Sequence, residues 1–458
     1  MVTASLPRSV RVGYGLGSFC SGTFGTVPGL LLLYYMTNSL GVPAGLAGLA
    51  VFLPKAWDIV INPYVGRLSD RTVSRFGPRR PWLLAGALLL PPAFALTFAG
   101  SPVRGGAAAL YVGLCFFLAA TAYALFEVPY KAMPAEMTDD YHEQSSLLTW
   151  RMGFLGLAIL LSGGLAPALV NMEGGEPSFA GYRTMGLVIG AVLLVAMAAT
   201  FFGTARAPRI ERAAPEHGTI REQLAAARGN RPFMLLLAIG ATQMFAVGIM
   251  LAGSPYFASY IVGDTGAITT LFLALIGPML VLMPAWVRVS RKYDKRASMV
   301  AASLLFLVAG AGLALTPTLG SAYAHACVMV MGVGYAGLQL LQFSMLADTL
   351  VYDELSSGKR RAGTFTGLWT GVETLLMALG ALVLGWVLDM AGFISSEPDE
   401  PVTQPDGALD AIVYGGALIP AAFMGLAIVC TLKYDLTAER LNALRASRTA
   451  PTATPEPL

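Results

Sequence analysis

Apolar stretches of about 20 residues recur along this chain, and a helix of that length crosses about 30 Å of hydrocarbon. Only 12% of the 458 residues are charged, about half the share in a soluble globular protein. The pattern therefore predicts an all-α protein that crosses a membrane many times. Apolar runs that are bounded by helix-breaking or polar residues define twelve predicted spans. They lie near 12–36, 43–67, 81–100, 107–132, 147–171, 183–204, 233–262, 266–288, 298–316, 321–349, 364–391 and 411–433.

The basic residues support this count. The only basic residues in the links after odd-numbered spans are Arg104 and Arg183. Four of the links after even-numbered spans contain clusters of basic residues, at 67–80, 206–231, 288–296 and 359–361. Basic residues collect on the cytoplasmic side of a membrane. We therefore expect an integral protein of the inner or plasma membrane with both termini in the cytoplasm.

The two halves of the chain resemble each other. The stretch "YALFEVPYKAMPAEMTDDY" at 123–141 aligns without gaps to "YAGLQLLQFSMLADTLVYD" at 335–353, which places Glu136 opposite Asp348. The loop "RLSDRTVSRFGPRR" has a shorter echo in "RVSRKYDKR" at 288–296. Both echoes pair a span with the sixth span after it, as in the six-plus-six duplication of the major facilitator architecture. This predicts two pseudo-symmetric six-helix bundles at 1–204 and 233–434, a cytoplasmic linker at 205–232 and a flexible cytoplasmic tail at 435–458.

Ionisable residues inside the spans are few, and they are costly unless they face protein or a water-filled cavity. They are Lys55 and Asp58 in the second span, with Asn62 one turn further on, Glu127 and Lys131 in the fourth, Arg151 in the fifth and Glu373 in the eleventh. Tyr123 and Tyr130 flank Glu127 on the same helical face. We interpret this cluster as the wall of a functional cavity. The alternative is structural: Lys55–Asp58 and Glu127–Lys131 would be local ion pairs that hold the bundle together.

The stretch "WDIVINPYVGRLSDRTVSRFGPRRPW" places Asp58 roughly 12 Å deeper than the basic loop that follows it, at 1.5 Å per residue. Within that loop, Asp70, Arg71 and Arg75 are candidate gating residues. Glu136 and Asp348, at the inner ends of later spans, are further candidates. A plain positively charged anchor is the competing interpretation of the loop.

Three motifs carry a family resemblance: "DIVINPYVGRLSDRTVSRFGPRRPW", "FEVPYKAMPAEM" and "ADTLVYDELSSGKRRAG". Together they resemble the signatures of the glycoside–pentoside–hexuronide:cation symporters, typified by the melibiose permease. The resemblance extends over the twelve spans and implies the major facilitator fold. Residue by residue, it implies cation binding at Asp58, a basic neighbour at Lys55, an acid bridging sugar and cation at Glu127, and an arginine near the sugar at Arg151.

Departures from the family pattern bear on the coupling ion and the substrate. The family's second acid in span two is Asn62 here, and its hydroxyl near the cation is Ala124. These losses weaken a sodium site at Asp58 and favour a proton, which needs a single carboxyl group. Gly22 stands where the family has an acid that holds sugar hydroxyls, and Lys131 stands where it has a tryptophan.

We therefore expect a secondary active transporter, a cation-coupled symporter of a sugar or glycoside that works by alternating access. The expected substrate-binding residues are Glu127, Lys131, Arg151, Tyr123, Tyr130 and Glu373. An amphipathic substrate such as a lysolipid is the alternative, and Lys131 and Arg151 would also suit an anionic uronide. A membrane enzyme or a sensor is a remote possibility, because no catalytic constellation appears. We expect no cofactor beyond H⁺ or Na⁺, no nucleic-acid partner, and function as a monomer in the bilayer.

Overall fold

The computed structural model describes residues 6–138, 140–172, 178–208, 220–359, 361–396, 402–437, 439–441 and 444. Twelve helical segments in these ranges are long and apolar enough to cross a membrane, which confirms the predicted all-α fold and the number of spans. The predicted spans 233–262 and 266–288 are indeed separate, because one helical segment ends at Val262 and the next begins at Ala267. Parts of the predicted linker and tail, at 209–219 and from 445 onward, lie outside the described residues.

The helices of the first half begin with a span made of two pieces. Between them, Gly17 lies so close to α5 that a Cβ atom there would be 2.4 Å from the Tyr130 ring. Glycine is thus the residue that lets the two elements meet at this point. The helices are α1 (Arg8–Leu16), α2 (Ser18–Ser39), α3 (Ala44–Asp70), α4 (Arg80–Phe98), α5 (Gly105–Met137), α6 (Tyr141–Val170) and α7 (Phe179–Gly203).

The second half contains two short π-helical segments besides its α-helices. Such segments are rare and occur frequently at functional sites. In chain order the elements are α8 (Ile220–Gly229), α9 (Arg231–Tyr256), π-helical η1 (Phe257–Val262), α10 (Ala267–Tyr293), α11 (Lys295–Gly312), the 3₁₀ turn η2 (Leu313–Leu315), α12 (Thr316–Leu319), α13 (Ser321–Ser357), α14 (Ala362–Met390), α15 (Asp406–Asp410), π-helical η3 (Ala411–Gly415) and α16 (Gly416–Leu432).

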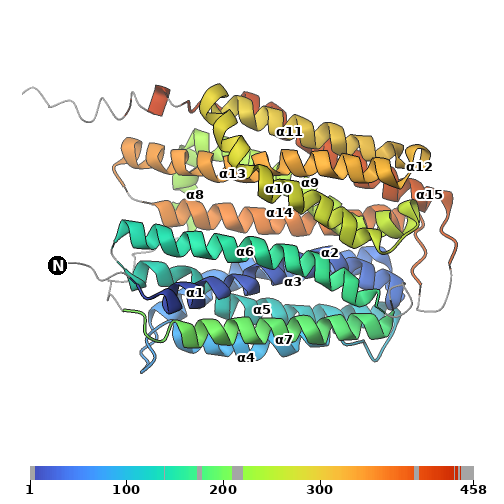
Figure 1. Cartoon of the computed structure of the whole chain (residues 1–458), viewed down its shortest axis with the longest axis horizontal. Helices are drawn as coiled ribbons and strands as arrows, with labels where there is room; N and C mark the ends of the chain where they lie inside the picture. The colour runs from blue at the N-terminus through green and yellow to red at the C-terminus, as the bar shows by residue number, and fades with distance from the viewer. Residues whose placement is uncertain are drawn as a thin grey trace, which may run out of the picture.

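The two halves lie side by side with their helices roughly parallel to one long axis (Figure 1). Helices α1 to α7 occupy the lower part of this view, and α9 to α16 the upper part. The halves meet where α3 packs on α14, α2 on α9 and α6 on α10. Leucines on the outer faces remain exposed, among them Leu110, Leu114 and Leu118 along α5. An apolar outer surface of this kind is suited to lipid.

Polar bonds join the two halves at the end opposite the basic loops. Thr37 Oγ1 lies 2.6 Å from the Tyr256 hydroxyl, and Tyr34 donates to Ser259 Oγ at 2.9 Å. The backbone of Ser396 exchanges hydrogen bonds with Thr37 and Gly41. At the basic-loop end, the ion pairs of Arg79 and Lys295 each stay within one half. The bonds of Thr37, Tyr34 and Ser396 thus join the halves at the opposite end.

Candidate functional site

Glu127 on α5 is the centre of a charged cluster in the first half. It is 3% exposed and accepts a hydrogen bond from Ser21 Oγ on α2 at 2.6 Å. Lys131 Nζ lies 3.0 Å and an Arg151 guanidinium nitrogen 3.7 Å from the other carboxylate oxygen. The sequence predicted that these three side chains share a site, and the structure brings them together. Two cations around one carboxylate leave the cluster with a net charge of +1.

Asp58 on α3 is a buried carboxyl group that forms no ion pair within the part of the chain that the structure describes. It is 5% exposed, and its Oδ1 atom has no hydrogen bond. Asn62, one turn further along, is half-buried and makes no described hydrogen bond to Asp58. Lys131 acts electrostatically on both Asp58 and Glu127, so the two carboxyl groups belong to one charge system.

Lys55 does not form the local ion pair that the structural interpretation would require. Its ammonium nitrogen lies 4.1 Å from the centroid of the Phe24 ring, and 5.6 Å from each of the rings of Phe116 and Tyr123. The rings of Phe24 and Tyr123 stack on each other with centroids 4.5 Å apart. An ammonium group over aromatic faces is stabilised by the ring quadrupoles. Tyr123, predicted to contact substrate, thus forms part of a cage around Lys55, and Asp58 is left unpaired among the described residues.

Tyr130 was also predicted to contact substrate, and in the structure it packs against α1 and α2. Its ring is fully buried and stacks on Tyr14 with centroids 4.7 Å apart. The hydroxyl donates to the Tyr14 carbonyl at 2.8 Å and lies 2.9 Å from Ser18 Oγ. Tyr130 therefore fixes α5 against α1 and α2. The Arg151 guanidinium of the charged cluster also lies over this ring, 5.8 Å from its centroid. Tyr130 thus borders the cluster, and its contact with substrate stays a prediction.

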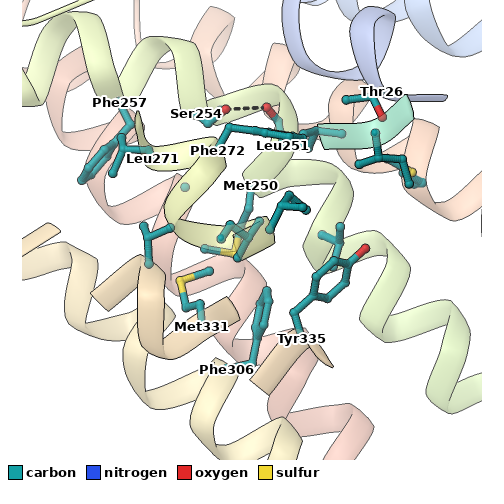
Figure 2. Close-up of a pocket in the computed structure, with 18 of the residues that line it drawn as sticks. Thr26, Met250, Leu251, Ser254, Phe257, Leu271, Phe272, Phe306, Met331 and Tyr335 are labelled. Carbon is teal, nitrogen blue, oxygen red and sulfur yellow. Dashed lines mark hydrogen bonds between the residues drawn. The ribbon is translucent and has the colours of Figure 1, made fainter. Parts of the chain in front are cut away.

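A cavity of about 280 Å³ lies between the halves and reaches into the second half. Figure 2 shows Met250, Phe306, Met331 and Tyr335 around its deep part. The first half contributes Ser21, Gly22, Gly25 and Thr26 from α2, and Leu155 and Ile159 from α6. Ser21 is also the residue that donates to Glu127. The cavity and the charged cluster are thus adjacent parts of one site.

Glu373 is half-buried on α14, in the second half. Lys131, on the first half, acts on it electrostatically. Glu373 does not line the cavity. It also acts electrostatically on Tyr335, which does line the cavity. These two charge contacts are what the structure offers for the prediction that Glu373 belongs to the site.

At the basic-loop end of the first half, the guanidinium of Arg79 joins three helices. It contacts Asp70 of α3 at 2.5 Å and Glu136 of α5 at 2.6 Å. Burial works against the charge, but the bonds to Glu136 and Asp70 outweigh burial and raise the pKa of Arg79. Gly77 adopts a φ of 89°, a left-handed conformation that favours glycine, and so turns the loop back toward α4.

The predicted gating arginines Arg71 and Arg75 are not part of this network. Both side chains are exposed, and Arg75 lies over the ring of its neighbour Phe76. Asp70 and Glu136 were predicted as gating residues, and Arg79 is the residue that connects them. The reason is steric. Helix α3 ends at Asp70, and the chain must turn before the side chain of Arg79 can reach both Asp70 and Glu136.

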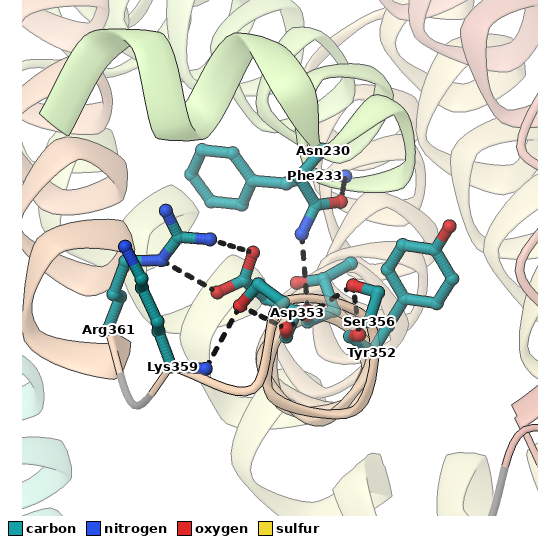
Figure 3. A network of polar contacts seen from close by, with 9 residues as sticks. Asn230, Phe233, Tyr352, Asp353, Ser356, Lys359 and Arg361 are labelled. Atoms are coloured by element: carbon teal, nitrogen blue, oxygen red, sulfur yellow. Dashed lines mark hydrogen bonds and ion pairs between the residues drawn. The ribbon is translucent and has the colours of Figure 1, made fainter. Parts of the chain in front are cut away.

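The second half repeats this arrangement in a reduced form. Lys295 Nζ lies 2.6 Å from Asp348, which aligns with Glu136, and Lys295 belongs to the basic loop that echoes the one containing Arg79. Close by, the Arg361 guanidinium makes two hydrogen bonds, of 3.1 and 3.2 Å, to the carboxylate of Asp353 (Figure 3). Asn230, which caps α9 by accepting from the backbone nitrogen of Phe233, packs beside this pair.

Comparison with known proteins assigns the family. The family model described as MFS/sugar transport protein matches residues 13–438. The chain belongs to this family. It is a twelve-span membrane transporter and not an enzyme, as the sequence predicted, and the symporter resemblance is confirmed.

Relatives of this transporter match it over nearly their whole length. The putative glycoside/cation symporter YagG of Escherichia coli strain K12 is 26% identical, with 95% of this chain and 93% of that protein covered. The isoprimeverose transporter of Lactiplantibacillus pentosus is 25% identical, with 94% and 89% covered. Among solved structures, a bacterial homologue of the human lysosomal transporter Spinster, in an inward-facing and unoccupied conformation, superposes with a TM-score of 0.68 at 14% identity, covering 96% of this chain and 98% of that one. This last likeness shows the fold alone.

Sequence reasoning missed three parts of the transporter's site. The apolar wall of the cavity gave no signal, because Met250, Phe306 and Met331 lie in spans where every neighbour is apolar as well. The aromatic cage around Lys55 depends on contacts among α2, α3 and α5 that no spacing reveals. Arg79 was not distinguished from Arg71, Arg75 and Arg80, because all four lie in the same basic loop.

Proposed function

We propose that this transporter carries a glycoside or a related polar solute together with a proton, and that Asp58 is the coupling group. The observation that supports this most is the unpartnered, buried carboxyl of Asp58. Burying an ionised carboxylate without a partner is strongly unfavourable, whereas a protonated or cation-bound carboxyl is not. A group in this position therefore takes up a cation whenever the site is closed to water.

The surroundings of Asp58 favour a proton over sodium. The polar residue one turn away, Asn62, carries no charge, and Ala124, at the α5 position where the family resemblance implies a hydroxyl near the cation, has no oxygen in its side chain. The ammonium of Lys55, held in its aromatic cage, adds positive charge near the carboxyl. Positive charge disfavours a second fixed cation in the same place, while a proton requires only the carboxyl itself.

The substrate class rests on the charged cluster and on the relatives. Lys131 and Arg151 can donate hydrogen bonds to hydroxyl or carboxylate oxygens of a sugar or uronide, while Glu127 accepts from hydroxyl groups. Lys131 is 43% exposed, so it can reach a solute without unfolding the cluster. Relatives named as glycoside and isoprimeverose transporters support the same class of solute.

Orientation follows from the distribution of basic loops. Because basic residues collect on the cytoplasmic side, the basic-loop end would face the cytoplasm, as would both termini, in an inner or plasma membrane. Cysteines in place of Val73 in the basic loop and Thr403 in the opposite acidic loop, both exposed positions, should label from opposite faces. Labelling of both from one face would contradict the twelve-span orientation.

Transport into proteoliposomes tests the coupling. Radiolabelled methyl glycosides and methyl glucuronide would be offered with a pH gradient, a sodium gradient or neither. We expect an inward pH gradient alone to drive accumulation of at least one solute, and a sodium gradient alone to drive none. Accumulation driven by sodium at constant pH would overturn the assignment of the ion.

A further inference from the structure

We propose that Lys55 is an internal cation that takes the place of the coupling proton at Asp58. Its ammonium lies in the aromatic cage while Asp58 is protonated, and it pairs with the carboxylate when the proton leaves for water. The cage is formed by the rings of Phe24, Phe116 and Tyr123. This proposal rests on the proposed function and adds to its coupling step a positioning residue, which exchanges one positive partner of the carboxyl for another.

The ammonium and the carboxyl lie within reach of each other on α3. Residues three positions apart on a helix are neighbours, with Cβ atoms about 5–6 Å apart. In the structure the Lys55 ammonium is 4.1 Å from the centroid of the Phe24 ring. Asp58 is nevertheless the charged group that acts on Lys55 most strongly. Because the lysine stem is flexible, rotation of this one side chain can bring the ammonium from the rings to the carboxylate without any movement of α3.

Each of the two positions compensates one charge inside the membrane. A transporter that has released its proton must return with Asp58 ionised, and a buried carboxylate without a partner is costly. Lys55 is the cation that acts on this carboxyl most strongly. Once Asp58 is protonated, the ammonium is the charge that needs stabilising, and aromatic faces supply it. The cage is preformed, because Phe24 is fully buried and stacks on Tyr123 with centroids 4.5 Å apart.

Other titratable groups face this pair or its neighbours, and none of them can replace Lys55. They are Cys20 on α2, Tyr123, Glu127 and Lys131 on α5, and Glu373 on α14. Thiols and phenols carry no charge at neutral pH. Lys131 also acts on Asp58, but its ammonium lies 3.0 Å from Glu127. Of the cations that act on Asp58, Lys55 is therefore the one that no carboxylate holds within the described residues.

Three variants separate the two positions of the ammonium. Lys55→Met removes it and leaves ionised Asp58 without a partner, so the proton should bind more tightly. Phe24→Leu weakens the cage and drives the ammonium to Asp58, so the proton should bind less tightly. Lys55→Arg keeps a cation that can reach both positions. Lys292→Met is the matched control, because that ammonium also lies over a ring, 4.9 Å from the centroid of Tyr293, but at an exposed position of α10.

The experiment uses the full chain in proteoliposomes and a methyl glycoside that the wild type accumulates. Net uptake is driven by an inward pH gradient, and exchange against unlabelled glycoside is measured at equal pH on both sides over a range of pH. Lys55→Met should lower net uptake by about tenfold or more, because the empty carrier must return with an uncompensated buried carboxylate. Exchange, in which the proton stays bound, should continue, and Lys55→Arg should recover net uptake.

The pH profile of exchange is the second measurement. Its upper midpoint should move to higher pH by about one unit in Lys55→Met, which is a tenfold gain in proton affinity. In Phe24→Leu the midpoint should move to lower pH, and in Lys292→Met it should stay where it is in the wild type.

Shifts of both midpoints in the same direction, or no shift in either variant, would overturn the proposal, because lost packing alone does not move proton binding in opposite directions. Loss of exchange together with net uptake in Lys55→Met would overturn it too, since the ammonium would then serve folding or substrate binding. Should Lys55→Met not fold, the midpoint in Phe24→Leu decides alone. Accumulation driven by a pH gradient in the wild type would leave the proposed function standing even where the variants of Lys55 behave as the wild type.

Discussion

The two halves of this transporter share one fold but present opposite chemistry to the space between them. The first half supplies Lys55, Asp58, Glu127, Lys131 and Arg151, and the second half supplies an apolar wall with Glu373 on a helix beside it. The same contrast holds at the basic-loop end, where Arg79 joins two acids and Lys295 of the second half joins one. In our proposal, the charges that couple transport to an ion therefore lie in the first half of the duplicated architecture.

The division has a physical reason. Ionisable groups inside a membrane protein stabilise one another only when they are close together. Spreading five of them over both halves would separate partners whenever the halves move apart. Keeping them on α3, α5 and α6 lets the charge system move as one unit. The second half can then change its apolar surface without disturbing the ion site.

The largest expected effect comes from removing the coupling charge of the first half. Asp58→Asn should abolish accumulation against a gradient while leaving downhill exchange, because the amide cannot carry a proton across. Accumulation and counterflow of the same methyl glycoside, measured in proteoliposomes, separate the two activities. A variant that accumulates solute normally would show that the charges of the first half do not couple transport.

The second prediction compares the two ion pairs at the basic-loop end. Breaking a buried pair costs about 3 kcal/mol, whereas a half-exposed pair contributes up to about 1 kcal/mol. Arg79→Ala should therefore lower the initial uptake rate by about tenfold or more, and Lys295→Ala by about fivefold at most. Substrate affinity should change little in either. Arg71→Ala and Arg75→Ala, at exposed positions, are the controls and should transport normally. Equal effects of Arg79→Ala and Lys295→Ala would remove the contrast between the halves.

A third prediction concerns the seal between the halves. A Cβ atom on Gly385 of α14 would lie 2.5 Å from the backbone oxygen of Ala44 on α3. Gly385→Ala should thus force the sealed end apart, and about 1 kcal/mol of strain shifts a two-state population about fivefold. A cysteine in place of Ser254 in the cavity should then label faster from the side opposite the basic loops. Gly277→Ala, with open space around it, is the control. Unchanged labelling in Gly385→Ala would show that this contact does not hold the end closed.

The smallest effect is expected at Tyr130. A variant at this position tests whether the residue serves helix packing or substrate binding in the first half. Tyr130→Phe removes the bonds to Ser18 and the Tyr14 carbonyl, worth about 1 kcal/mol of unfolding free energy. Thermal unfolding should shift slightly, and affinity for methyl glycosides should stay unchanged. A clear loss of affinity for methyl glycosides, with stability as in the wild type, would show that Tyr130 contributes to the binding site.

Much of the architecture could be read from the sequence, because the signals are local or repeated. Apolar length and the positions of basic residues predicted the twelve spans, and the aligned stretches at 123–141 and 335–353 predicted the pairing of Glu136 with Asp348 as equivalents. The cluster of Glu127, Lys131 and Arg151 was also accessible, since charges inside apolar spans must find one another.

The remainder depends on contacts between helices. Tyr123 and Tyr130 occupy the same face of α5, yet one cages Lys55 and the other packs on α1, because their different heights along the helix meet different neighbours. The apolar wall could not be distinguished from lipid-facing positions, since Phe306 in the cavity and Leu305 on the outer surface are adjacent apolar residues. Only the packed structure separates them.

Substrate-driven proton movement tests the central claim most directly. Proteoliposomes containing a pH-sensitive dye, with the membrane potential held at zero, would be given a glycoside that the wild type accumulates. Our account predicts that inward flow of the glycoside acidifies the interior, that sodium makes no difference, and that Asp58→Asn abolishes the signal while glycoside still exchanges. Glycoside entry without any proton movement in the wild type, or an equal signal in Asp58→Asn, would contradict it.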